Sequence, residues 1–138
     1  MNVLVDTSVW SLALRRKAHQ LNPAERSIVV ELAELIQEGR ARLIGLIRQE
    51  LLSGIKAVDQ YENLRATLRS FPDETVETSD YESAAKGSNA CRSIGIAVSA
   101  VDALICTIAA SRGWPIFTVD PDFENYARIL PLKLHAPR

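Results

Sequence analysis

Two short apolar segments, each followed by an aspartate, constrain the fold of this chain more than any other feature. Residues 2–5 precede Asp6, and residues 116–119 precede Asp120. Both are too short for a typical helix, whereas the stretches between them carry apolar residues at helical spacing. Short strands that alternate with helices predict an α/β sandwich with a mostly parallel sheet. A chain of 138 residues has the length of one compact domain, so we expect a single domain over residues 1–138.

Local signals divide the rest of the chain into strands and helices. Further strands are expected over residues 42–46, 75–77 and 132–134. Asn22, Pro23 and Glu25 form a strong helix start, because these residue types cap, begin and close a first turn. Ser79 and Glu82 have the spacing of a second capping box. The expected helices cover residues 8–16, 23–39, about 47–54, 58–71, 79–93, 99–113 and 121–128.

Composition narrows the functional classes. A hydrophobic content of 47% and a charged content of 24% are ordinary for a globular domain. The net charge of −1 gives no global attraction to nucleic acid, although basic residues can still gather on one face. Cys91 and Cys106 lie in no metal-binding motif, so we expect buried cysteines and no zinc site. With no signal peptide and no apolar stretch of ~18 residues, a cytoplasmic protein without membrane contact is expected.

Four acidic residues lie where strand and helix signals meet. Asp6 and Asp120 each follow a strand. Glu50 begins the helix after the second strand, and Asp102 lies inside an otherwise apolar helix pattern. Ligands of open parallel sheets bind beyond the carboxyl ends of the strands. We therefore expect the four carboxylates to converge on one rim of the sheet.

Convergence of these acids would require a cation or a proton. Two carboxylates ~4 Å apart repel by about 4 kcal/mol at an effective dielectric near 20. Protonation relieves such repulsion, and so does a divalent ion. Sites built only from oxygen ligands favour Mg²⁺ or Mn²⁺ over zinc. These ions activate water and stabilise charge on phosphate, so the pattern points to hydrolysis of phosphodiesters.

A purely structural role remains open for each acid. Ser99 and Asp102 fit a capping box, in which the Asp102 carboxylate bonds back to the backbone of Ser99. Asp120 precedes Pro121 as a helix N-cap does, and Glu50 alone has the pattern of a solvated helix residue. Asp6 alone fits a turn. The short hydroxyl residues beside the acids either orient the carboxylates or merely cap the chain; they are Thr7, Ser8 and Thr118.

Four motifs of this chain resemble those of the PIN-domain nucleases, specifically the VapC-type toxins of bacterial and archaeal toxin–antitoxin pairs. They are VLVDTSVW at 3–10, QELLSG at 49–54, DALI at 102–105 and TVDPDF at 118–123. Their order and spacing fit along nearly the whole chain. The resemblance implies a three-layer α/β/α sandwich and an endoribonuclease that depends on Mg²⁺ or Mn²⁺. It also implies a homodimer and a VapB-like antitoxin as partner.

The resemblance assigns a role to each acid. The implied catalytic residues are Asp6, Glu50, Asp102 and Asp120, and the implied metal ligands are Asp6, Asp102 and Asp120. Asp6 and Asp102 would bind the ion directly, while Glu50 and Asp120 would position or deprotonate the attacking water. The supporting residues are Asp122, Thr118 and Ser8. Basic side chains expected to hold RNA phosphates are Arg15, Arg48 and Arg92.

Other functions are weighed against the nuclease. A haloacid-dehalogenase-type phosphatase needs a second aspartate two residues after the first, where this chain has Ser8. A response-regulator receiver needs an early acidic pair and a late lysine at a strand end, and this chain has neither in place. Two alternatives stay open: a PIN-domain RNase that is not a toxin, and a catalytically silent PIN-fold protein that binds RNA or acts as a scaffold.

Overall fold

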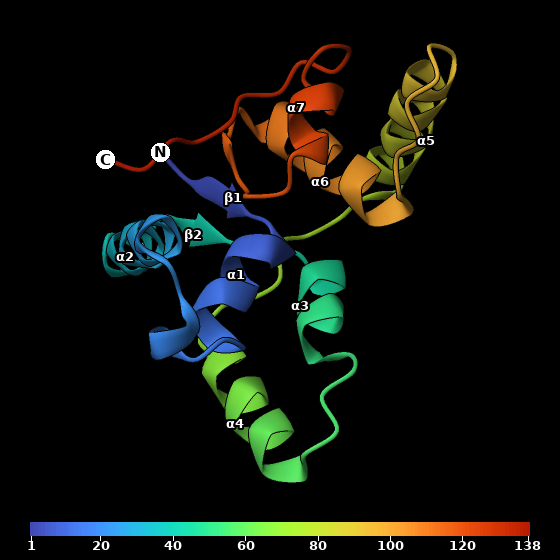
Figure 1. Ribbon diagram of the computed structural model, residues 1–138. Coiled ribbons are helices and arrows are strands. Elements are labelled where there is room, and N and C mark those ends of the chain that lie inside the picture. The colour runs from blue at the N-terminus through green and yellow to red at the C-terminus, as the bar shows by residue number, and fades with distance from the viewer.

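Three short parallel strands form the sheet of this protein, whose computed structural model describes residues 1–138 throughout. The strand order is β2 (Ala41–Arg42), β1 (Val3–Val5) and β3 (Ile116–Phe117), so the N-terminal strand is central (Figure 1). Leu4 pairs with Arg42 on one side and Ile116 on the other. Every residue of β1 is buried, which explains why this strand is apolar on both faces.

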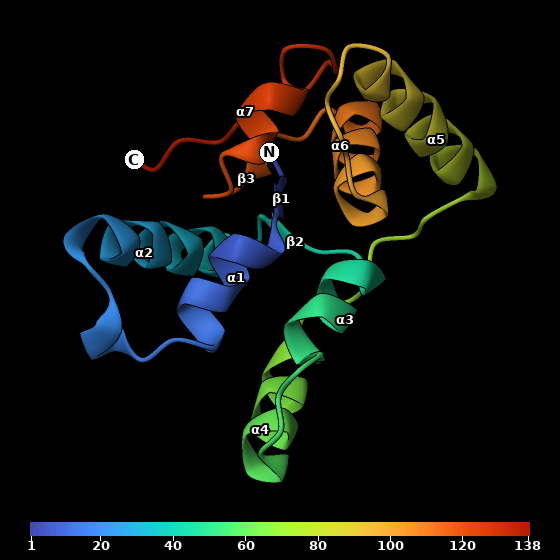
Figure 2. The ribbon, with the colours of Figure 1, turned by 45° about the vertical axis from the view of Figure 1, so that its right-hand side comes forward.

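Helices cover both sides of the sheet. They are α1 (Thr7–Leu14), α2 (Pro23–Gln37), α3 (Gly45–Leu52), α4 (Val58–Leu68), α5 (Thr78–Arg92), α6 (Ala100–Arg112) and α7 (Asp122–Tyr126). Figures 1 and 2 show α1 and α2 on one side, α5 and α6 on the other, and α3 and α4 extending away from the sheet. The expected α/β/α fold with a parallel sheet is confirmed. None of the helices combines the length and the apolar character needed to cross a lipid bilayer.

Two helix starts follow the signals in the sequence. Asn22 Oδ1 accepts a hydrogen bond of 2.8 Å from the Glu25 backbone N–H, and Glu25 Oε1 accepts one of 3.0 Å from the Asn22 N–H. This is the predicted capping box of α2. At α6, Ser99 Oγ accepts a 3.1 Å bond from the Asp102 N–H. The same helix ends at Gly113, whose φ of 71° is the left-handed conformation that glycine adopts readily.

Several predicted boundaries were wrong. The strand expected over 42–46 ends at Arg42, because Gly45 already begins α3. A short apolar run does not distinguish a buried strand from the first turn of a helix. The strand expected over 116–119 ends at Phe117, and residues 132–134 contribute one isolated bridge, from Leu134 to Ile116. Residues 75–77 form no strand.

The start of α5 also differs from the prediction. Glu77 and Asp80 form its capping box, with a 2.9 Å bond from the Glu77 N–H to Asp80 Oδ2, instead of Ser79 and Glu82. Asp80 is buried and lies 3.6 Å from the Arg112 guanidinium, whereas Glu82 is exposed. The earlier box therefore also satisfies a buried acid, which local sequence spacing does not reveal.

The hydrophobic core is one cluster of 25 buried residues that contacts all three strands. Trp10 is fully buried in it, and its Nε1–H donates a 3.1 Å hydrogen bond to the Val5 carbonyl. Its ring packs edge-on against Phe71, with 5.0 Å between ring centroids. Cys91 and Cys106 are buried and unbridged, which confirms their predicted role as small apolar residues.

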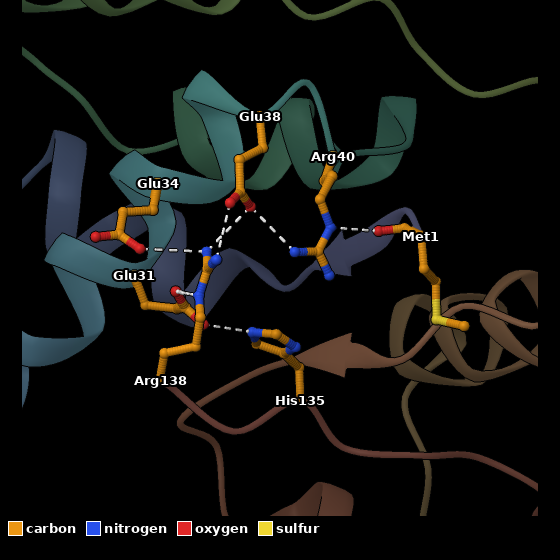
Figure 3. A network of polar contacts seen from close by, with 7 residues as sticks. All are labelled: Met1, Glu31, Glu34, Glu38, Arg40, His135 and Arg138. Carbon is orange, nitrogen blue, oxygen red and sulfur yellow. Dashed lines mark hydrogen bonds and ion pairs between the residues drawn. The ribbon is translucent and has the colours of Figure 1, made fainter.

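The C-terminal segment is tied to α2 by a network of polar side chains (Figure 3) and to β3 by backbone hydrogen bonds. The backbone N–H of His135 donates a 2.8 Å hydrogen bond to the Ile116 carbonyl. The ring nitrogen Nε2 of His135 lies 2.8 Å from Glu31 Oε2. The Arg138 guanidinium lies within 3.0 Å of Glu31, 3.3 Å of Glu34 and 2.8 Å of Glu38. Glu31 is only 3% exposed, so this buried acid is satisfied by residues more than 100 positions away in the chain.

We expect Glu31→Gln to lower the free energy of unfolding by about 1 kcal/mol at pH 7. Burial alone raises the pKa of the Glu31 carboxyl, but contacts with His135 and Arg138 outweigh it, and the pKa lies below 4.5. Because the pKa of Glu31 is lower in the folded protein than in the unfolded chain, its ionised carboxylate stabilises the fold above about pH 4.5. This contribution is lost as pH falls below that value. Urea unfolding at pH 7 and pH 3 measures both effects. The exposed Glu82→Gln is the control; equal stabilities of the two variants at pH 7 would contradict the prediction.

Candidate active site

The four predicted acids line one pocket at the carboxyl end of the sheet. The pocket has a volume of about 430 Å³. Its lining residues are Asp6, Thr7, Ser8, Leu46, Gln49, Glu50, Ser53, Val101, Asp102 and Asp120. A larger pocket of about 520 Å³ lies between α5, α6 and residues 130–131, but its only acid is Asp80, which is already bonded. The convergence of carboxylates marks the smaller pocket as the candidate site.

Asp6 is the most firmly held of the four. It caps α1 in extended conformation, directly after β1, and is only 4% exposed. Its Oδ2 accepts bonds of 2.7 Å from Ser8 Oγ and 2.9 Å from Thr118 Oγ1. The same two hydroxyls accept backbone N–H bonds from Val119 and Asp120, at 3.1 and 3.0 Å. Ser8 and Thr118 therefore join the ends of β1 and β3 while they orient Asp6.

Each of the other three acids is held through one of its two carboxylate oxygens. Glu50 Oε1 accepts a 2.6 Å bond from Thr7 Oγ1. Asp120 Oδ1 accepts a 2.9 Å bond from the Asp122 N–H, and Asp102 Oδ2 accepts one of 2.9 Å from the Tyr126 hydroxyl. In all four acids the second oxygen accepts no hydrogen bond from the protein. The fold thus fixes the carboxylates and leaves one acceptor on each for a ligand.

The electrostatics of Asp102 reveal the crowding of charge. Burial is the largest cause that raises the pKa of this carboxyl, from 3.8 to about 6, and the charges of Asp6, Asp120 and Glu50 raise it further. The Tyr126 hydrogen bond acts in the opposite direction. Burial, together with the bond to Asp102, raises the pKa of the Tyr126 hydroxyl, which therefore remains protonated as a donor. Repulsion by the other three acids is therefore one cause of the raised pKa of Asp102, and burial is the larger one.

The residues fit a hard divalent cation held by few ligands. The polar side chains that line the pocket carry carboxylate, hydroxyl or amide groups. The oxygens of such groups are ligands that suit Mg²⁺ or Mn²⁺. No group of three acidic, histidine or cysteine side chains is placed to hold one ion, so the predicted three-ligand set is not assembled around a single point. Mg²⁺ commonly keeps several waters and uses one or two carboxylates. The residues that would hold such an ion are Asp6 and Asp102, each of which keeps one carboxylate oxygen free of protein hydrogen bonds.

Comparison with known proteins identifies the fold family. A family model described as PIN domain matches residues 3–129. The chain belongs to the PIN domain family. No curated protein sequence is similar enough to this PIN domain to count as a match.

Solved structures resemble this PIN domain over nearly its whole length. FitAcB from Neisseria gonorrhoeae matches at 20% identity with a TM-score of 0.75, covering 98% of this chain and 97% of the other. A structure of VapBC2 from Rickettsia felis matches at 16% identity and a TM-score of 0.72, covering 98% of both chains. That protein is bound to a DNA fragment from its promoter. A toxin–antitoxin complex from Klebsiella pneumoniae matches at 18% identity and a TM-score of 0.59, covering 88% and 90%. At such identities the likeness establishes the fold.

The Arg48 side chain of this PIN domain, predicted to contact RNA, is held by hydrogen bonds within the protein. Its Nε–H donates a 2.8 Å bond to Asp73 Oδ1, and its Nη1–H donates one of 2.9 Å to the Leu68 carbonyl. A third bond reaches the Phe71 carbonyl. The guanidinium therefore joins α3 to the end of α4 and has few donors left for phosphate. Arg15 and Arg92 are exposed, and neither lines the pocket.

Three polar residues of this site were not predicted from the sequence. Gln49 and Ser53 line the pocket beside Glu50. Their place beside Glu50 in the QELLSG motif was an available signal, since Gln49 lies on α3 and Ser53 caps the end of this helix. Tyr126 has no such signal, since it lies 24 positions from Asp102 in a separate helix. Asp122 lies in the first turn of α7, is exposed and contacts Asp120 through its backbone alone.

Proposed function

We propose that this PIN domain is an endoribonuclease that hydrolyses RNA phosphodiesters with Mg²⁺ or Mn²⁺, and that residues 1–138 act as one nuclease domain. One observation carries the proposal. Four carboxylates from separate segments line one pocket, and each keeps an oxygen free of protein hydrogen bonds. Such an arrangement is costly for folding unless a cation compensates it.

The proposed mechanism gives the acids two tasks, and Asp120 takes part in both. Asp6 and Asp102 would hold the ion, with Asp120 beside them, and the ion would supply positive charge against the scissile phosphate. Glu50 and Asp120 would orient the attacking water and accept its proton. The water oxygen would form a bond to phosphorus while the bond to the leaving ribose oxygen breaks, and that oxygen would take up a proton from solvent water. Ser8, Thr118 and Thr7 would keep the carboxylates oriented through the hydrogen bonds described above.

We further propose that the protein is the toxin of a toxin–antitoxin pair, with a VapB-like antitoxin as partner and a homodimer as its working form. The motifs resemble VapC-type toxins, and the similar Klebsiella structure is described as a toxin–antitoxin complex. A PIN-domain RNase outside such a pair is the second candidate. A silent scaffold is less well supported, because the set of four acids is complete.

Removal of divalent ions should abolish RNA cleavage by the purified protein. We expect cleavage of some member of a panel of transfer, ribosomal and messenger RNA with 5 mM Mg²⁺ or Mn²⁺, assuming about millimolar affinity, and none with excess EDTA. Added Mg²⁺ in excess over the chelator should restore the rate. Cleavage that resists EDTA, or no cleavage of any RNA, would contradict the proposal.

Growth of cells that express the protein tests the toxin assignment separately. Expression of the active chain should arrest growth, and co-expression of the protein encoded beside it should relieve the arrest. RNA cleavage without growth arrest would favour the second candidate, an RNase outside a toxin–antitoxin pair.

A further inference from the structure

Tyr126 holds Asp102 from outside the four sequence motifs, just after the TVDPDF motif ends at Phe123. It lies at the end of α7, is 3% exposed, and packs edge-on against Phe123 with 5.2 Å between ring centroids. Phe123 is itself fully buried in the core. The Tyr126 hydroxyl donates a 2.9 Å bond to Asp102 Oδ2. A buried ring thus fixes the position of the donor.

Asp102 has no other hydrogen bond through its carboxylate. Its backbone N–H bonds Ser99 Oγ at 3.1 Å, which is one half of a capping box. The other half, from the Ser99 N–H to the Asp102 carboxylate, is not formed. Tyr126 therefore competes with the local alternative in which Asp102 turns back to close the box. Without the hydroxyl, the carboxylate would be free to rotate toward the backbone of Ser99.

This bond also connects two segments of the site. Asp120 and Asp122 immediately precede or begin α7, and the Asp122 N–H holds Asp120 Oδ1 at 2.9 Å. The bond from Tyr126 to Asp102 joins α7 to α6. The Tyr126 hydroxyl therefore links the position of Asp102 on α6 to that of Asp120, which follows β3.

We propose that Tyr126 is a positioning residue that holds Oδ2 of Asp102 and so leaves Oδ1 as the oxygen that binds a divalent cation. The inference rests on the proposed function of the same site. Hydrogen-bond partners of metal-binding side chains fix ligand orientation, and their loss commonly costs 10–100-fold in metal affinity or activity.

The test is Tyr126→Phe, which removes the hydroxyl and keeps the buried ring. We expect Mn²⁺ affinity, measured by calorimetry without RNA, to fall about 10-fold or more. RNA cleavage should fall at low Mn²⁺ and recover when Mn²⁺ is raised. The control is Tyr81→Phe, which removes the hydroxyl of an exposed tyrosine on α5. Urea unfolding of both variants measures any effect on stability separately.

The outcomes separate this inference from the proposed function. Unchanged Mn²⁺ affinity in Tyr126→Phe, even with lower stability, would show a merely structural role and overturn the inference. A wild-type protein that binds Mn²⁺ but cleaves no RNA would refute the proposed function, while a weaker Tyr126→Phe site would still support the inference. A wild-type protein that binds no Mn²⁺ overturns both.

Discussion

Asp6→Asn should reduce Mg²⁺-dependent RNA cleavage at least about 100-fold. Asparagine has nearly the shape of aspartate and can still accept the hydrogen bonds from Ser8 and Thr118. The substitution therefore removes the negative charge and one ligand oxygen while it retains the local structure. Initial cleavage rates at saturating Mg²⁺, measured on one RNA, give the effect directly.

Asp59→Asn is the matched control for this experiment. Asp59 lies in the first turn of α4, is exposed, and does not line the pocket. We expect its cleavage rate to equal that of the wild type. Undiminished cleavage by Asp6→Asn would remove the mechanism, because the most firmly bonded acid of the site would then be dispensable.

Asp102→Asn should have two opposite effects: loss of RNA cleavage, and a gain of about 2 kcal/mol in stability at pH 7 without divalent ions. The pKa of Asp102 is raised from 3.8 to about 6, so between these values the folded protein binds a proton that the unfolded chain does not. Stability therefore falls as pH rises through this range, and the ionised carboxylate destabilises the fold at pH 7. A difference of about two pH units corresponds to about 3 kcal/mol, which partial exposure reduces to about 2 kcal/mol.

Urea unfolding in EDTA at pH 7 and pH 4 tests the second effect. The gain should shrink to less than half at pH 4, where most of the Asp102 population is protonated in the folded protein. Added Mg²⁺ should stabilise the wild type and narrow the difference from the variant, since a ligand that binds only the folded state stabilises it. If Asp102→Asn instead destabilises the metal-free protein at pH 7, burial and the neighbouring acids do not destabilise the ionised Asp102 carboxylate as expected.

Local interactions explain which features could be predicted from the sequence. The apolar residues of β1, the capping box at Asn22 and the end of α6 at Gly113 depend on neighbours within about one helical turn. Asp6 and Asp120 follow the first and third strands, so the parallel arrangement brought them to one rim as expected. Both the fold class and the convergence of the four acids were therefore accessible from pattern alone.

Contacts between distant segments were decided only by tertiary structure. Arg48 has the charge of a phosphate ligand, yet packing of α3 against α4 directs its guanidinium to Asp73 and two carbonyls. Tyr126 has no local pattern that relates it to Asp102, because the position of α7 beside α6 results from burial of Phe123 and its neighbours in the core. The sequence thus determined which carboxylates meet at the sheet. Packing determined that the Tyr126 hydroxyl holds Asp102 and that Arg48 bonds Asp73, because a hydrogen-bond partner is selected by position in three dimensions and not by spacing along the chain.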